Sequence, residues 1–344
     1  MNQQTYYITK DIISTLSSQL KSIHAKHVFI VHGKGSYRAC GAEDVMKAVC
    51  SNVSVSEFAD FSVNPKDEEA QKGVQLLLEA KADVIIAIGG GSAMDTSKLI
   101  RHYAAEQNYH VPLIAIPTTA GTGAEATHFA VVYKNGVKHS VEADDILPDV
   151  AILYPPFTYD NSAYLTACTG FDALAQAIEA YWNPKANDES KQYSVRAIKM
   201  IYNQLPECIE HPERVSLRDE LLQGAYWAGR AINITKTTAP HAFSYVFTSK
   251  YGYPHGHAVA LTFPFFMKLN GNEELFERFG FHSADAAQQM ESYISSLGIS
   301  LKLPASVDVK SALQAVNLQR LANNPVVVTE EITSALAEYL KSHQ

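Results

Sequence analysis

The chain has 344 residues and a mass of 37.8 kDa, a length that favours two domains over one. With 47% hydrophobic and 19% charged residues, it has the composition of a globular protein and not of a disordered one. The formal net charge of -8 and the lack of a dense basic run argue against nucleic acid as a partner.

Neither a membrane span nor a secretory signal is expected. No apolar run approaches the ~18 residues that a spanning helix needs, and the first residues carry no basic segment. The four cysteines form no Cys-x-x-Cys pair and no disulfide framework. They are Cys40, Cys50, Cys168 and Cys208. We therefore expect a cytoplasmic protein with reduced thiols and no membrane partner.

The first half of the chain alternates short β-branched runs with amphipathic stretches. The nearly continuous apolar run at 84–88 is typical of a strand buried on both faces of a parallel sheet. The alternation predicts right-handed βαβ units with helices on both sides of the sheet. Strands are expected at 27–32, 53–58, 84–88 and 113–116, and helices at 38–50, 67–82 and 92–103.

The second half of the chain is helical almost throughout, with apolar positions three and four residues apart. The best boundary lies near Tyr154-Pro155-Pro156, which predicts domains at 1–155 and 156–344. The cleft between the two halves is then the expected place for a ligand. The expected helices are 163–182, 189–204, 217–232, 284–297 and 332–340.

A glycine-rich turn, Gly89-Gly90-Gly91-Ser92, directly follows the strand at 84–88 and opens a helix. Glycines let a phosphate approach the backbone closely, and the helix N-terminus supplies unpaired N–H groups. Ser92 could cap this helix and donate to an oxygen. Because the spacing is not the Gly-x-Gly-x-x-Gly of the ordinary dinucleotide fold, a tight turn without a ligand is the alternative.

A second small-residue loop at 117–125 follows the strand at 113–116 and carries Thr118, Thr119 and Thr122. Its hydroxyls could bind phosphate or ribose, or only their own backbone. Two such loops at the carboxyl ends of neighbouring parallel strands favour a dinucleotide.

The helical half holds a possible metal site. Asp172 and Gln176 are four residues apart, so they share one helix face. His241 and His255 follow later in the chain. A carboxylate, an amide oxygen and two imidazoles could hold a divalent ion such as Zn²⁺ or Fe²⁺. The alternative is a set of satisfied polar side chains.

Four strings in this order resemble the iron-containing (group III) alcohol dehydrogenase family: GGGSAMDTSK (89–98), PTTAGTGAEAT (117–127), TGFDALAQAIEAY (169–181) and PHGHAVAL (254–261). Glycerol dehydrogenases and dehydroquinate synthases share this architecture. The resemblance implies an α/β N-terminal domain with a parallel nucleotide-binding sheet and an all-α C-terminal domain. It also implies a metal in the cleft and a homodimer.

The resemblance assigns roles to single residues. It places a pyrophosphate turn on residues 89–92, a metal aspartate on Asp172, and two further metal ligands on His241 and His255.

Two residues depart from the pattern of the family. Gln176 stands where the family usually has histidine, so it would coordinate weakly or leave a water in its place. Tyr245 replaces a third histidine, where it could relay a proton or simply pack. The remaining cofactor contacts implied by the resemblance are Asp95, Thr118, Thr119, Thr122 and Lys138.

The segment after the first strand bears on the choice of cofactor. NAD-selective enzymes often present an acid to the ribose there, but this chain has His32-Gly33-Lys34-Gly35-Ser36. Lys34 and Ser36, beside Gly33, could instead meet a 2′-phosphate. This predicts NADP(H) in preference to NAD(H), unless Lys34 is only a solvated turn lysine.

The segment before His241 suggests an anionic substrate. Lys236 lies among three threonines, a group that suits a phosphonate, phosphate or carboxylate. NITKTTAPHAFSY, with Gln176, is similar to the phosphonoacetaldehyde reductase branch of the family. A capped helix with an exposed lysine is the alternative.

These residues predict reduction of a small aldehyde by NADPH at a metal that polarises the carbonyl. His257, Tyr245 or a water would supply the proton. Two alternatives remain open: a lyase of dehydroquinate synthase type, and a nucleotide-binding protein that has lost its metal.

Overall fold

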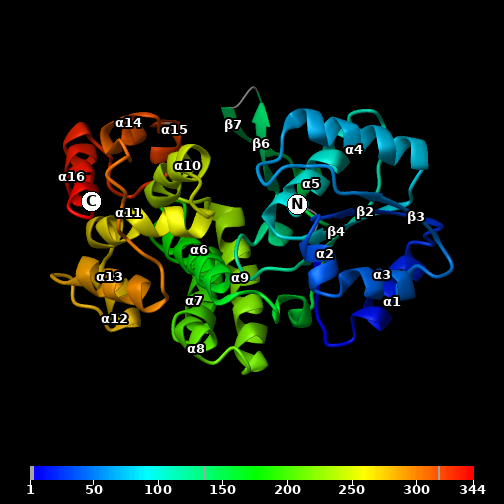
Figure 1. Ribbon diagram of the computed structural model, residues 1–344, viewed down its shortest axis with the longest axis horizontal. Coiled ribbons are helices and arrows are strands. Elements are labelled where there is room, and N and C mark those ends of the chain that lie inside the picture. The colour runs from blue at the N-terminus through cyan, green and yellow to red at the C-terminus, as the bar shows by residue number, and fades with distance from the viewer. Residues whose placement is uncertain (1–3, 135–136, 317) are drawn as a thin grey trace. The chain divides into compact units, whose positions relative to one another are not determined.

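The computed structural model describes residues 4–134, 137–316 and 318–344 (Figure 1). The chain divides into two compact units, Met1–Asn161 and Ser162–Gln344. They are called here the sheet unit and the helical unit. The expected boundary between residues 155 and 156 falls near the end of the sheet unit and stays a prediction.

The sheet unit is built on a parallel sheet, which confirms the expected fold class. Within the described residues it has six strands, all parallel to their neighbours. In spatial order they are β1 (Thr5–Ile8), β8 (Val150–Leu153), β5 (Leu113–Pro117), β4 (Val84–Gly89), β2 (His27–His32) and β3 (Ser54–Phe58).

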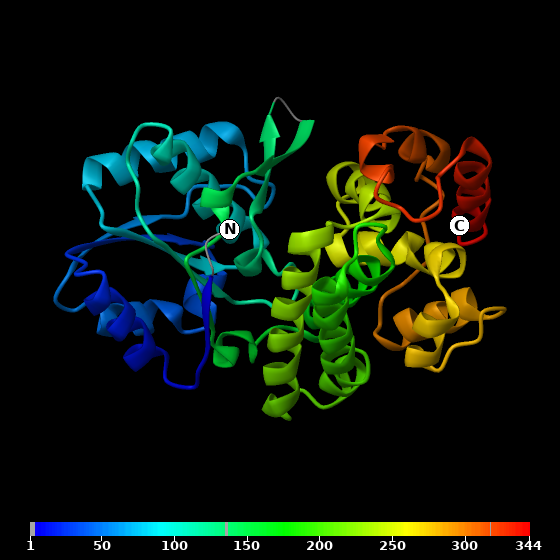
Figure 2. The same cartoon turned by 180° about the vertical axis from the view of Figure 1, so that it is seen from behind.

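Helices cover both faces of this sheet (Figures 1 and 2). Because successive side chains of a strand point to opposite faces, Phe29 and Val31 join one buried cluster while Val28 and Ile30 join the other. The first cluster is covered by α4 (Asp67–Ala80) and α5 (Gly91–Ala105), and the second by α1 (Ile12–Ser22), α2 (Ser36–Ala39) and α3 (Ala42–Val49).

Smaller elements complete the sheet unit. An antiparallel pair, β6 (Phe129–Lys134) and β7 (Val137–Glu142), stands apart from the main sheet. The described residues of this unit also form short 3₁₀ turns at Ala124–Ala126, Asp144–Ile146 and Pro155–Thr158.

The helical unit is arranged around α6, which is buried along most of its length and packs against α7, α9 and α11. Its helices are α6 (Ala163–Trp182), α7 (Asp188–Ile201), α8 (Gln204–Glu210), α9 (Val215–Thr235), α10 (Ala239–Tyr251), α11 (His255–Asn270), α12 (Glu273–Phe279), α13 (Ala286–Ser296), α14 (Val309–Gln314), α15 (Leu318–Leu321) and α16 (Glu330–Lys341).

Two local expectations are wrong. The single helix expected at 38–50 is divided into α2 and α3, because Gly41 between them adopts a left-handed φ of 77°. Ser92 does not cap α5, because the helix begins one residue earlier and Gly90 occupies the N-cap position. The Ser92 hydroxyl instead donates to the carbonyl of Val63.

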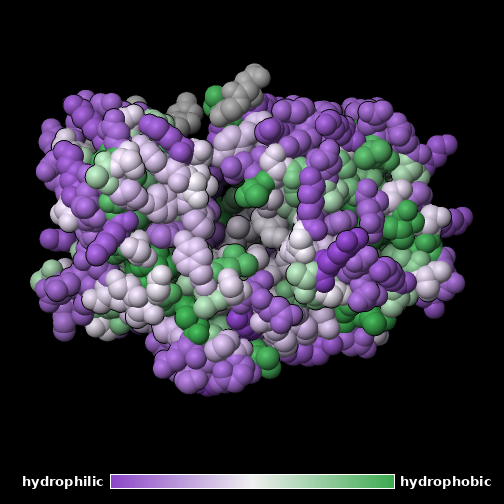
Figure 3. Space-filling view, in the orientation of Figure 1, coloured by the Kyte–Doolittle hydropathy of each residue, from purple (hydrophilic) through white to green (hydrophobic). Residues whose placement is uncertain are grey.

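Hydrophilic side chains cover much of the face shown in Figure 3. None of the helices in the described part of the chain is both long and apolar enough to span a bilayer.

Asp83 fixes the start of two central strands. Its carboxylate accepts hydrogen bonds from the backbone N–H groups of Lys26 (2.6 Å) and His27 (2.8 Å), just before β2 pairs with β4. These bonds, the one from Lys26 first, hold the pKa of Asp83 below its usual value. The register they support also sets where the other ends of β2 and β4 lie.

Replacing Asp83 with asparagine is expected to lower the free energy of unfolding by about 1–2 kcal/mol at pH 7, because the charge-assisted bonds are lost. A depressed folded-state pKa stabilises the protein above the unfolded pKa of about 4, and this contribution fades as the pH falls further. Denaturant titrations at several pH values measure it, with the exposed Asp44→Asn as control. A loss that is the same at pH 3 and pH 7 would contradict this role.

Candidate functional site

Three helices bring the expected metal ligands together in the helical unit. Asp172 lies on α6, His241 on α10 and His255 at the first position of α11. One ligand atom from each lies within 4.8 Å of the others. The Asp172 Oδ1 atom is 3.1 Å from His241 Nε2 and 3.6 Å from His255 Nε2. Asp172 and His241 are buried, and His255 is partly exposed, so the cluster is accessible from one side.

Gly256 makes this arrangement possible. A Cβ atom at this position would lie 1.8 Å from the carbonyl oxygen of Cys168 and 3.1 Å from the Cβ of Asp172. The start of α11 therefore contacts the backbone of α6 directly, and that contact places His255 beside Asp172. Only glycine allows so close an approach.

Glu179 supports the second imidazole. It lies two helical turns after Asp172 on α6 and is fully buried. Its carboxylate accepts from His241 Nδ1, and from the backbone N–H (2.6 Å) and hydroxyl (2.7 Å) of Thr238. Since Nδ1 faces Glu179, Nε2 is the His241 nitrogen that faces Asp172 and can bind a metal.

The electrostatics of the cluster favour a cation. Burial alone would lower the pKa of His241, but the carboxylates of Glu179 and Asp172 outweigh it and raise that pKa to about 10. Burial opposes the ionised form of Asp172, yet His255 and His241 hold its pKa below the usual value. Two buried carboxylates around one imidazole thus create a place for positive charge.

The surroundings of Gln176 also favour a bound cation. Its Nε2 donates to Asp172 Oδ2 (3.2 Å), which confirms that the two side chains share a helix face. Its Oε1 is buried and has no hydrogen-bond partner in the described residues. This buried acceptor without a partner lies on the side chain next to Asp172, and with the carboxylate and the two imidazoles it would make an oxygen and nitrogen donor set that suits Fe²⁺ or Zn²⁺.

The two candidate proton donors differ in their surroundings. The Tyr245 ring lies parallel to the His255 imidazole, with the ring centroids 6.0 Å apart. His257 instead has Nε2 2.7 Å from the Ser300 carbonyl and Nδ1 2.7 Å from the Tyr164 hydroxyl. The carbonyl can only accept, so Nε2 carries the proton and Tyr164 donates to Nδ1. Burial lowers the pKa of His257, which favours this neutral ring.

In the sheet unit, the two predicted phosphate loops lie against each other. The Thr118 N–H donates to the Gly89 carbonyl (2.9 Å), and a Cβ on Gly91 would lie 3.0 Å from the Thr122 side chain. Thr119 approaches Gly90 in the same way, and the backbone of Gly33 lies beside Gly89. The turn, the threonine loop and Gly33 thus meet at the carboxyl ends of β2, β4 and β5. Thr122 also accepts from the Ala124 N–H (3.3 Å), as the backbone-bonding alternative expects.

A buried lysine links α5 to the segment that follows the threonine loop. Lys98 is fully buried on α5, and its ammonium donates to the Thr127 hydroxyl (2.9 Å) and the Phe129 carbonyl (3.0 Å). Burial lowers the pKa of Lys98 to about 8, and burial raises that of Glu125 to about 7. Burial also raises the pKa of Asp95 to about 6, against the opposing charges of Lys98 and of Lys138 on β7.

Lys34 forms an ion pair that its sequence context did not predict. Its ammonium lies 3.3 Å from Asp60, which follows β3, and both side chains are exposed. An acidic residue just after the neighbouring strand therefore competes for the lysine charge that is expected to meet a 2′-phosphate. The Ser36 hydroxyl lies beside Gly33.

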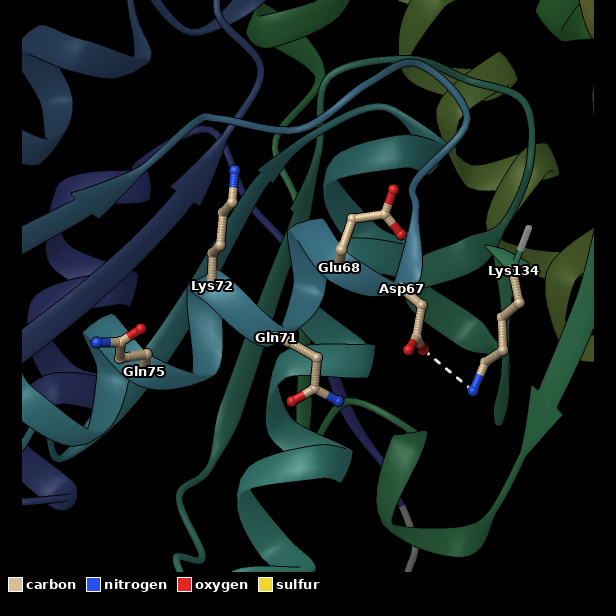
Figure 4. Close-up of a pocket in the computed structure, with 6 residues that line it drawn as sticks. All are labelled: Asp67, Glu68, Gln71, Lys72, Gln75 and Lys134. Atoms are coloured by element: carbon tan, nitrogen blue, oxygen red, sulfur yellow. Dashed lines mark ion pairs between the residues drawn. The ribbon is translucent and has the colours of Figure 1, made fainter. Parts of the chain in front are cut away.

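The hollow shown in Figure 4 is a separate feature. It is lined by polar and charged side chains of α4 together with Lys134, which forms an ion pair with Asp67 (3.1 Å). None of the predicted site residues lines it.

The sequence motifs assign no role to Glu179, Lys98 or Tyr164. Glu179 and Lys98 stand inside the quoted motifs, where a charged residue at an otherwise apolar helix position was the available signal. Tyr164 carried no such signal, because its partner His257 is far away in the sequence.

Comparisons with known proteins match both halves of the chain. Residues 3–155 match the family model for iron-containing alcohol dehydrogenase, and residues 166–335 match the C-terminal model of the same family. The NAD-dependent methanol dehydrogenase of Bacillus methanolicus is 31% identical over 76% of this chain and 73% of its own length. Long-chain-alcohol dehydrogenase 1 of Geobacillus thermodenitrificans is 27% identical over 95% and 92%.

A solved structure extends the comparison to three dimensions. The sulfoacetaldehyde reductase of Bifidobacterium kashiwanohense, crystallised in complex with NAD+, is 27% identical to this chain. It aligns with a TM-score of 0.92 over 100% of this chain and 98% of its own.

Replacing Glu179 with glutamine is expected to weaken binding of Zn²⁺ or Co²⁺ about 10–100-fold, because the His241 ring loses its charged orienting partner. Competition of the purified apoprotein against a chromophoric chelator measures this affinity. The exposed Glu189→Gln in the same unit is the control. If wild type and Glu179→Gln bind the metal with equal affinity, and circular dichroism shows that both are folded, the role assigned to Glu179 is contradicted.

Proposed function

We propose that this chain, which belongs to the iron-containing alcohol dehydrogenase family, reduces a small anionic aldehyde to the corresponding alcohol with NAD(P)H. Family membership makes it an alcohol dehydrogenase, and therefore an oxidoreductase. The clustering of Asp172, His241 and His255 is the observation that carries the proposed chemistry.

Asp172, His241 and His255 would hold a divalent ion, with Gln176 as a weaker fourth ligand. Such an ion supplies Lewis-acid polarisation of a carbonyl oxygen. Glu179 keeps His241 in the tautomer that can bind it, and Gly256 keeps His255 beside Asp172. The donor set contains no thiolate and suits either Fe²⁺ or Zn²⁺.

The reduced nicotinamide supplies the hydride. We assign its pyrophosphate to the turn at 89–92 and to Thr118, Thr119 and Thr122, with Asp95 and Lys138 nearby. Lys34 and Ser36 are the basis for proposing NADPH as the preferred form. The ion pair between Lys34 and Asp60 works against that preference, so the two cofactors must be compared directly.

The alcohol product requires a proton as well as a hydride. Tyr245 is the better-placed protein donor, because its ring lies against that of His255. His257 would have to act through Tyr164, since Nδ1 accepts from that hydroxyl while Nε2–H is bonded to Ser300. A water is the third candidate.

The anionic character of the substrate is supported from two sides. Lys236 directly follows α9 and lies two residues before Thr238, which hydrogen-bonds Glu179 as His241 does. We propose that Lys236 contributes positive charge to the substrate site. The similar sulfoacetaldehyde reductase is named for an aldehyde that carries a sulfonate. Phosphonoacetaldehyde is an aldehyde of similar size that also carries an anionic group.

We further propose that the protein is a homodimer.

Oxidation of NADPH and NADH by aldehydes tests the proposal, with protein loaded with Fe²⁺ or Zn²⁺ in turn. We expect kcat/KM for phosphonoacetaldehyde, sulfoacetaldehyde or succinic semialdehyde to exceed that for propanal at least about tenfold, since one charge-assisted contact contributes at least that much. Turnover should stop when a chelator removes the metal and return when it is restored. Equal or better kcat/KM for propanal would refute the anionic substrate class.

A further inference from the structure

Arg320 lies close to the candidate metal site without belonging to any predicted motif. It is on α15, and its guanidinium carbon lies 4.7 Å from the centre of the Tyr245 ring. The same ring lies parallel to the imidazole of His255, at an interplanar angle of 2°. Arg320 and the candidate ligand His255 therefore both contact one aromatic side chain.

In the part of the chain that the structure describes, no carboxylate balances the charge of Arg320. Among the described residues, no acidic side chain forms an ion pair with its guanidinium, whereas Arg38, Arg101, Arg214 and Arg278 each have such a partner. Arg320 is also partly buried. A partly desolvated cation without a counter-charge is unfavourable by itself and is stabilised when an anion binds.

The chain segment that follows Arg320 is firmly attached to the helices of the site. Asn324 is buried, and its Oδ1 accepts from the N–H of Ala239 at the start of α10 (3.4 Å) and from Asn270 at the end of α11 (2.7 Å). The Asn323 amide donates to the Thr237 carbonyl (3.4 Å). These bonds join the segment to the helices that carry His241, Tyr245 and His255.

The chemistry of arginine indicates what binds there. A guanidinium presents a planar set of N–H donors that matches two oxygens of a sulfonate, phosphonate or carboxylate. The Tyr245 ring restricts the orientation of this plane, which lowers the conformational entropy lost on binding. An uncharged alcohol would leave the same guanidinium unpaired.

We propose that Arg320 binds the anionic group of the substrate while the aldehyde end lies at Asp172, His241 and His255. This inference rests on the proposed function and adds the residue that selects for charge. Because Arg320 and His255 both lie beside the Tyr245 ring, the site favours a short aldehyde with the anion a few bonds from the carbonyl.

Steady-state kinetics of Arg320→Met and Arg320→Lys test the proposal. We expect Arg320→Met to lower kcat/KM for sulfoacetaldehyde and phosphonoacetaldehyde on the order of 100-fold, mainly through KM, since a truncated charge pair loses at least that much. The kcat/KM for propanal should change less than about threefold, because no ion pair is involved. Arg320→Lys should recover part of the lost kcat/KM, because lysine keeps the positive charge but lacks the planar guanidinium that forms two parallel hydrogen bonds.

A matched control is Arg196→Met, because Arg196 also lies over an aromatic ring, that of Trp227 (4.0 Å), but belongs to α7. It should leave both substrate classes unchanged. If Arg320→Met lowers propanal turnover as much as that of the charged aldehydes, its role is structural and the inference is wrong. If only Lys236→Met impairs the charged aldehydes, the inference is also wrong.

Inhibition by ethanesulfonate separates this inference from the proposed function, because that anion carries no carbonyl. Wild type should be inhibited competitively against the aldehyde, and Arg320→Met should need on the order of 100-fold more inhibitor. If wild type prefers propanal, the proposed substrate class fails, but the inhibition assay still tests Arg320. Equal inhibition of wild type and Arg320→Met overturns the inference.

Discussion

The candidate metal site depends on one buried contact, that between His241 and the two carboxylates of α6. Asp172 and Glu179 are separated by two helical turns, so both face the same imidazole from one rigid helix. Burying two carboxylates is unfavourable unless they are hydrogen bonded and meet positive charge. Glu179 accepts two hydrogen bonds from Thr238 and one from His241. Asp172 accepts one from Gln176 and lies beside His241 Nε2. A divalent ion between Asp172, His241 and His255 would supply the remaining charge.

In the sheet unit, the order of the strands determines which loops meet at the candidate nucleotide site. The strands β2, β4 and β5 are neighbours and parallel, so the turns that follow them leave the sheet at the same edge. Gly33, the turn at 89–92 and the threonine loop are brought together by this topology. Lys98 then ties the segment after the threonine loop to α5. The candidate nucleotide site therefore combines loops that allow close approach with a buried lysine that hydrogen-bonds the segment after one of them.

Periodicity predicted the elements that are strongly buried. The strand at 84–88 and the helix at 163–182 agree with β4 and α6, because their apolar patterns are continuous or helical. It did not predict β1, an edge strand whose Tyr6 and Ile8 are exposed, nor the short β8 and the β6–β7 pair. The helix break at Gly41 was also missed, because a single glycine gives only a weak signal within an amphipathic run.

In the candidate site, too, the sequence predicted some residues and missed others. Asp172 and Gln176 could be paired by spacing alone, because they lie on one helix, and the structure confirms their contact. His241 and His255 were assigned by resemblance and are close to Asp172 in space. Arg320 could not be found in this way, since only the packing of α15 against α10 brings it to Tyr245. Long-range contacts between short elements leave no periodic pattern in a sequence.

Anomalous diffraction from crystals of the metal-loaded protein, measured on both sides of the iron or zinc absorption edge, shows directly whether Asp172, His241 and His255 bind the ion. We expect one strong peak about 2.0–2.2 Å from an Asp172 oxygen, His241 Nε2 and a His255 nitrogen. A peak bound elsewhere, or these three side chains directed away from the bound ion, would contradict it.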